Sequence, residues 1–153
     1  MLWLAVATVP WMAALSIIDI RARRLPNWLT LPGAAVILTV ATVSGHGYEA
    51  MTGGLGLAGV YLVTHLLSPR GMGAGDVKLA LGIGALTGTF GLGAWFLCAV
   101  GAPLLTVVAG VVSVAFVRRA SALSQARRIR LPHGPSMCAA AVVAIGFAVA
   151  AGE

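Results

Sequence analysis

Asp19 and Asp76 are the residues of this chain whose type and placement could do chemistry, and they are its only aspartates. Asp19 ends an apolar segment and precedes a short arginine cluster, whereas Asp76 opens an apolar segment within the stretch RGMGAGDVKLAL at 70–81. A carboxylate beside a membrane segment is kept there at a cost in free energy, so it marks a functional site by default. Two such residues point to a pair.

A pair of carboxylates a few ångströms apart can share one proton, because both cannot ionise cheaply at once. The ionised aspartate would take a proton from a water held between them, while the protonated one would hydrogen-bond the carbonyl of a scissile peptide. Water attack would give a tetrahedral diol, and return of the proton to the nitrogen would release the amine. Such a pair needs no metal and no cofactor.

The composition excludes a soluble domain and indicates a polytopic membrane protein, since 59% of the residues are hydrophobic, 9% are charged and the mean hydropathy is +0.98. The net charge of +6 does not indicate a nucleic-acid partner, because the basic residues lie in short gaps between apolar runs. The basic clusters at 118–130 are expected to contact anionic lipids. Cys98 and Cys138 are isolated within apolar runs, so we expect packing residues and no metal site.

Apolar runs along the chain predict an all-α integral membrane protein with six transmembrane helices in a single domain, 1–153. The runs are 1–18, 29–43, 50–67, 77–117 and 136–151. As one helix the run 77–117 would be about 60 Å long, so it must fold back as two spans, with a turn near the glycines at 88–93. Glycines at 53–59 and the GxxxG of Gly84 and Gly88 predict close helix packing.

The placement of charge tests this count independently. When Lys78, at the edge of the fourth run, is counted with the third gap, the five gaps hold three, none, two, none and five of the 10 Lys and Arg residues. By the positive-inside rule the odd-numbered gaps are cytoplasmic, so both chain termini face outward. Asp19 and Asp76 then lie at the same membrane face and are expected to be close in space.

Three stretches carry a resemblance to a known family: RRLPNWLTLP soon after Asp19, GMGAGDVKLALGIGALTG around Asp76, and LPHGP before the last span. Their ordered combination resembles the type IV prepilin peptidases, the A24 family of GxGD-type membrane aspartyl proteases. The resemblance implies that Asp19 and Asp76 are catalytic. It further implies an endopeptidase of the bacterial inner membrane that removes prepilin leaders at the cytoplasmic face, usually after a glycine.

The chain departs from the longer prepilin peptidases in two places. Its first gap, 19–27, leaves no room for the cysteine-bearing zinc motif of enzymes that also N-methylate the pilin, so it looks more like the peptidase-only form of Flp/Tad pilus systems. His133 stands where the last motif of the family is expected to have an aromatic residue.

Four further residues are candidates for substrate binding. Gly73 and Gly75 lack side chains and would permit a tight turn and the approach of an extended substrate strand. Lys78 lies about 200° around a helix from Asp76, so it would either reach toward lipid phosphate or contact substrate. Asn27 would either order the chain near Asp19 or simply mark a helix boundary.

Other interpretations remain open from the residues alone. Asp19 could pair with Arg23, and Asp76 could be a first-turn residue favoured by the helix dipole. A small proton-coupled transporter is an alternative, although coupling sites usually lie near the bilayer midplane. A non-catalytic pilus or secretion assembly subunit is another, and a presenilin-like protease shares GxGD. The sequence does not identify the pilin, the residues preferred around the cut, the oligomeric state, the aspartate that holds the proton, or a separate source of methylation.

Overall fold

The computed structural model describes residues 2–22, 24–69, 72–120 and 133–152. These residues form six α-helices and no strand, which confirms the predicted all-α fold and the number of helices. The helices are α1 (Leu2–Ala22), α2 (Asn27–Val43), α3 (Gly47–Leu67), α4 (Ala74–Gly88), α5 (Leu92–Ala120) and α6 (Gly134–Ala151).

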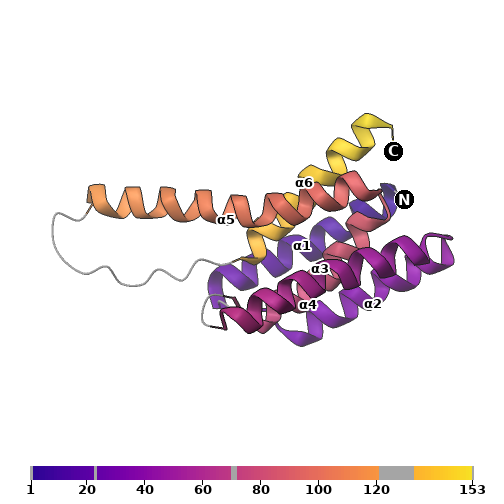
Figure 1. The fold of residues 1–153 in the computed structure, drawn as a ribbon, viewed down its shortest axis with the longest axis horizontal. Helices are drawn as coiled ribbons and strands as arrows, with labels where there is room; N and C mark the ends of the chain where they lie inside the picture. Colours follow the sequence, from indigo (N-terminus) through magenta and orange to yellow (C-terminus); the bar gives the residue numbers. More distant parts are fainter. Residues whose placement is uncertain (1, 23, 70–71, 121–132, 153) are drawn as a thin grey trace.

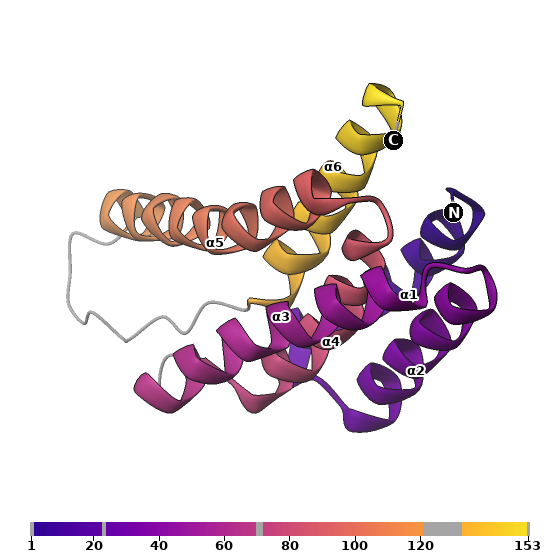
Figure 2. The ribbon, with the colours of Figure 1, turned by 45° about the vertical axis from the view of Figure 1, so that its right-hand side comes forward.

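The six helices run alternately up and down, so both chain termini lie at the same end of the molecule (Figure 1). We call the opposite end the aspartate end. It contains the last turn of α1, the starts of α2, α4 and α6, and the connections 24–26 and 72–73. α3 packs closely along α4, and α5 packs mainly on α6. α5 and α6 stand to one side of α2 and α3 (Figure 2).

The helices extend beyond the apolar runs that predicted them. The first apolar run ends at residue 18, but α1 continues to Ala22, so Asp19 lies inside its last turn rather than in a polar gap. The extension has a physical reason, because no proline follows Asp19 until Pro26 and Arg21 suits the negative end of the helix dipole. α2 begins at Asn27 directly after Pro26, whose backbone is extended.

Glycines bring α3 and α4 into backbone contact, as the sequence predicted. A Cβ built on Gly53 would lie 2.5 Å from the carbonyl oxygen of Gly84, and a Cβ on Gly84 would lie 2.5 Å from that of Gly53. Gly88 is equally close to the backbone of Glu49. The predicted turn after α4 is residues 89–91, where Gly91 has a φ of +96°. This packing fixes α4, which carries Asp76, against its neighbour.

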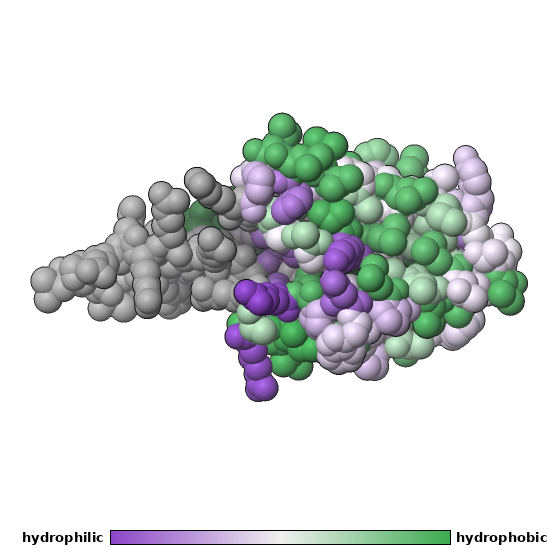
Figure 3. Space-filling view, turned by 90° about the horizontal axis from the view of Figure 1, so that it is seen from below, coloured by the Kyte–Doolittle hydropathy of each residue, from purple (hydrophilic) through white to green (hydrophobic). Residues whose placement is uncertain are grey.

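Four segments, α1, α3, α6 and residues 92–113 of α5, are long and apolar enough to cross a membrane. α2 is apolar but has 17 residues, and α4 has 15, about 22 Å of helix. Large apolar side chains are exposed along the helices, among them Leu104, Val111 and Phe147. Seen from below, strongly hydrophilic residues gather at one end of the described surface, and hydrophobic residues cover much of the rest (Figure 3). The chain is therefore a multi-pass membrane protein, while six spans and outward termini remain predictions.

Candidate active site

Asp19 projects from the last turn of α1 into the aspartate end and is only 6% exposed. One of its carboxylate oxygens, Oδ2, accepts a hydrogen bond of 2.9 Å from the backbone N–H of Gly134, the first residue of α6. The two residues are 115 positions apart in sequence. The start of the last helix therefore holds the first aspartate.

Asp76 lies in the first turn of α4 and is 7% exposed. Its Oδ2 accepts a hydrogen bond of 3.0 Å from the N–H of Gly73, and the carbonyl of Gly73 in turn accepts from the N–H of Asp76 at 3.1 Å. An acidic residue at this third position of a helix reaches back to the preceding backbone in the manner of a capping box. The turn itself therefore orients the second aspartate.

Burial and nearby groups shift the pKa of Asp76. Asp76 opens α4, outside the four helices long enough to span the membrane, and burial raises the pKa of its carboxyl group. The N–H of Gly73 and positive charge on His133 and His65 lower that pKa, whereas negative charge on Asp19 raises it. Asp76 is therefore a buried acid whose pKa depends in part on the charge of Asp19.

His133 caps the start of α6 and is anchored to α5. Its Nδ1 lies 3.2 Å from the hydroxyl oxygen of Thr106, which donates its own proton to the carbonyl of Ala102 at 3.0 Å. The hydroxyl oxygen must then accept from His133, so Nδ1 carries the proton. His133, whose role the sequence left open, thus ties the start of α6 to α5 near both aspartates.

Lys78 and Asn27 contact each other at the aspartate end. The ammonium group of Lys78 donates a hydrogen bond of 2.7 Å to the side-chain oxygen of Asn27, 51 residues earlier. The bond joins the first turn of α2 to the first turns of α4. Neither the lipid contact nor the substrate contact considered for Lys78 anticipated this pairing.

The two glycines before Asp76 have different surroundings. Gly73 is exposed, with extended backbone at the start of α4. Gly75 is half-buried, and a Cβ there would lie 2.9 Å from the Cβ of Leu25 in the α1–α2 connection.

His65, near the end of α3, contacts the connection before Asp76. Its ring lies 2.8 Å from the carbonyl of Met72, and since a carbonyl only accepts, Nδ1–H is the donor. The chain before Asp76 is therefore packed from two sides.

Sequence reasoning named Asp19, Asp76 and Gly73 but missed the group that holds Asp19. Gly134 was noted only as part of a motif, and His65 and Thr106 were given no role in the site. Gly134 contacts Asp19 across 115 residues, so no local pattern signals that contact. The one available signal was LPHGP, which places a glycine where a helix starts with free backbone N–H groups.

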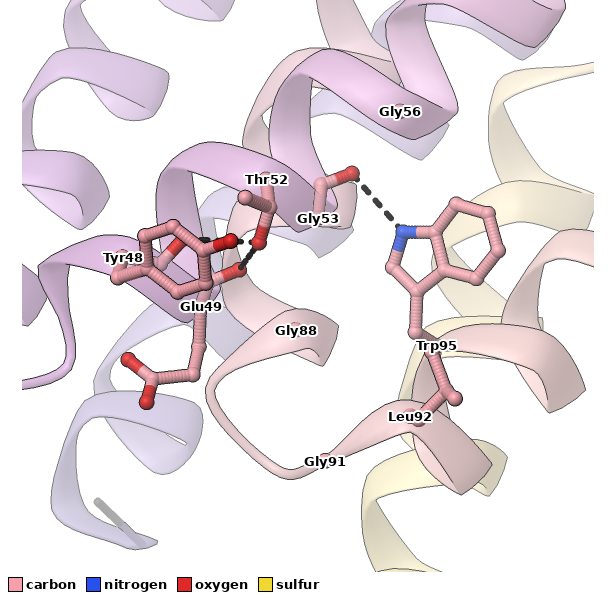
Figure 4. Close-up of a pocket in the computed structure, with 9 residues that line it drawn as sticks. All are labelled: Tyr48, Glu49, Thr52, Gly53, Gly56, Gly88, Gly91, Leu92 and Trp95. Atoms are coloured by element: carbon pink, nitrogen blue, oxygen red, sulfur yellow. Dashed lines mark hydrogen bonds between the residues drawn. The ribbon is translucent and has the colours of Figure 1, made fainter.

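A cavity of about 330 Å³ lies at the opposite end of the molecule, where α3 begins and α4 is followed by α5. The indole N–H of Trp95 donates a hydrogen bond of 2.8 Å to the carbonyl of Gly53 across it (Figure 4). Its lining consists of Tyr48, Glu49, Thr52, Gly53, Gly56, Gly88, Gly91, Leu92 and Trp95. This cavity contributes nothing to the chemistry of the aspartates. Within the described ranges no three His, Cys, Asp or Glu side chains are grouped to hold a metal ion.

A helical membrane protein with two buried aspartates at one end is the class that the fold and the site define. A model of the type IV leader peptidase family matches residues 6–118, which include both aspartates and end before α6. The chain therefore belongs to the type IV leader peptidase family, as its motifs predicted. No curated protein and no solved structure matches the chain.

Proposed function

We propose that this protein is an aspartic endopeptidase that removes the leader of type IV-like prepilins through a pair formed by Asp19 and Asp76. The observation that carries the proposal is the placement of both aspartates, buried, at one end of a member of the type IV leader peptidase family. In each of them a backbone N–H holds Oδ2. A carboxylate held in this way is oriented before substrate arrives, which is what proton transfer requires.

The reaction follows from the pair. One aspartate is ionised and takes a proton from a water, and the other is protonated and hydrogen-bonds the scissile carbonyl oxygen. The water oxygen bonds to the carbonyl carbon and forms a diol, and a proton then passes to the leaving nitrogen as the carbon–nitrogen bond breaks. The pair returns to its starting protonation state, so one water is consumed for each peptide bond cut.

The location of the pair fits a substrate that lies partly in the bilayer. In the sequence, Asp19 and Asp76 border the first and third gaps between apolar runs, to which the Lys and Arg count was assigned, so the positive-inside rule assigns both aspartates to the cytoplasmic face. An apolar pilin helix would stay in the lipid while the extended leader junction reaches the aspartates. We place the enzyme in the bacterial inner membrane and, because 24–26 is a short connection, among the peptidase-only forms of Flp/Tad systems.

The test is co-expression of the full chain with candidate prepilins, read by mass spectrometry of the pilin N-terminus. Wild type is expected to remove the leader, whereas Asp19→Asn and Asp76→Asn are each expected to leave it in place. Glu49→Gln is the matched control, because it removes a carboxylate at the opposite end, in the first turn of α3, and should process normally. Normal processing by either aspartate variant would refute the pair.

Controls separate catalysis from folding. Each variant is compared with wild type for membrane insertion and for its unfolding midpoint in detergent micelles. An uncut prepilin beside a well-inserted wild-type protein, with several prepilins tried, would shift the interpretation to a non-proteolytic role such as transport or assembly.

A further inference from the structure

The start of α6 reaches Asp19 from a part of the chain that the family match does not cover. Gly134 is the first residue of the helix, where backbone N–H groups have no partner inside the helix. Its N–H donates to Oδ2 of Asp19 at 2.9 Å within the protein interior. Asp19 therefore accepts a hydrogen bond from an N–H group that has no acceptor inside its own helix.

A side chain at residue 134 would meet the carboxylate itself. A Cβ built there would lie 2.8 Å from Oδ2, 3.2 Å from Cγ and 3.3 Å from Cβ of Asp19. The φ of Gly134 is not positive, so the backbone conformation does not require glycine. Glycine is required here for a different reason: without a side chain at residue 134, the backbone N–H can approach the carboxylate of Asp19.

Relief of that clash would rotate the Asp19 side chain and would leave the helix positions nearly unchanged. The nearest atom is the end of a side chain that can rotate, whereas backbone atoms of neighbouring helices are not among the closest contacts. The start of α6 is also held independently by the bond from His133 to Thr106 on α5. An alanine at 134 would therefore turn Asp19 away while the helix stays in place.

We propose that Gly134 is a positioning residue for peptide cleavage, which holds the Asp19 carboxylate by its backbone N–H and by having no side chain. The inference rests on the proposed function. It adds the start of α6 to a site otherwise made by α1 and α4. Gly134 does not touch the substrate in this proposal and acts only through Asp19.

Processing kinetics give the first test. Gly134→Ala in the full chain is expected to lower kcat about 100-fold, the usual effect of a misplacement near 1 Å, while KM stays unchanged. Gly146→Ala is the matched control, because it lies on the same helix with nothing within 4 Å of an added Cβ. It should process at the wild-type rate. A wild-type kcat for Gly134→Ala would overturn the proposal.

A second measurement does not depend on activity. The amide proton of Gly134, observed by NMR in detergent micelles, should resonate downfield because it binds a carboxylate, and should move upfield in Asp19→Ala. The amide of Gly146 should not move. If the Gly134 amide also stays unmoved, the contact is absent and the proposal fails, even where Gly134→Ala is inactive through misfolding.

The two proposals fail in different ways. Normal processing by Asp19→Asn would remove the proposed function, whatever the Gly134 variant does. Loss of processing in Asp19→Asn with a wild-type rate in Gly134→Ala would leave the protease in place and refute only the positioning role.

Discussion

The contact between α3 and α4 should be intolerant of a single methyl group. A Cβ at Gly84 would lie 2.5 Å from the carbonyl oxygen of Gly53 and 2.7 Å from Cβ of Leu57, whereas ordinary contact begins at 3.4 Å. Neither neighbour can rotate away, so the helices would have to separate by nearly 1 Å. Overpacking of this kind costs about 1–3 kcal/mol, against roughly 1 kcal/mol that alanine gains over glycine in a helix. We expect Gly84→Ala to lose up to about 2 kcal/mol, and to be about 1–3 kcal/mol less stable than an exposed helical glycine changed to alanine.

Gly59→Ala is the matched control, since Gly59 lies on α3 with nothing within 4 Å of an added Cβ. It should keep or raise stability. The assay is thermal unfolding in detergent micelles, followed by circular dichroism at one fixed heating rate. For a chain of this size a loss of about 2 kcal/mol in Gly84→Ala corresponds to a midpoint lower by about 4–8 °C. If Gly84→Ala unfolds at the temperature of Gly59→Ala, the packing argument is wrong.

Two further predictions concern contacts between helices. Lys78→Met and Asn27→Ala should show a coupling in a double-mutant cycle of stability of at most about 1 kcal/mol, because their 2.7 Å bond is solvent-exposed; additive losses would contradict a direct interaction. Trp11→Phe should cost about 1 kcal/mol in unfolding free energy, because it removes the 2.9 Å hydrogen bond to the carbonyl of Leu29. An unchanged unfolding midpoint for Trp11→Phe would show that this bond does not stabilise the packing of α1 on α2.

The apolar runs predicted the six helices because hydropathy over such lengths has few competing explanations. They placed the helix ends less well, since a helix does not stop where hydrophobicity stops. α1 continues through Asp19 to Ala22 because its backbone meets no proline between Pro10 and Pro26. α6 likewise begins at Gly134 rather than at Ser136. The basic clusters at 118–130 were predicted to contact lipid, and most of that stretch lies outside the described residues.

The site was predictable only in part. Composition singled out Asp19 and Asp76 because a chain with so few charges makes each carboxylate conspicuous, and charge alternation assigned both to one end. The hydrogen bonds that orient them were not predictable in the same way. Gly73 is three residues from Asp76, so a capping pattern could have indicated that contact. Gly134 and Asp19 are 115 residues apart, and a periodic pattern in the sequence cannot predict a contact over such a separation.

The positions of the two aspartates on their helices explain why the site needs a third helix. Asp76 lies at the start of α4, where the positive end of that helix and the N–H of Gly73 favour a negative charge. Asp19 lies at the end of α1, where the negative end of its own helix disfavours one. A donor for Asp19 must therefore come from elsewhere, and the first N–H of α6 supplies it. The up-and-down order of the helices brings these three helix ends together, because it returns α4 and α6 to the end where α1 finishes.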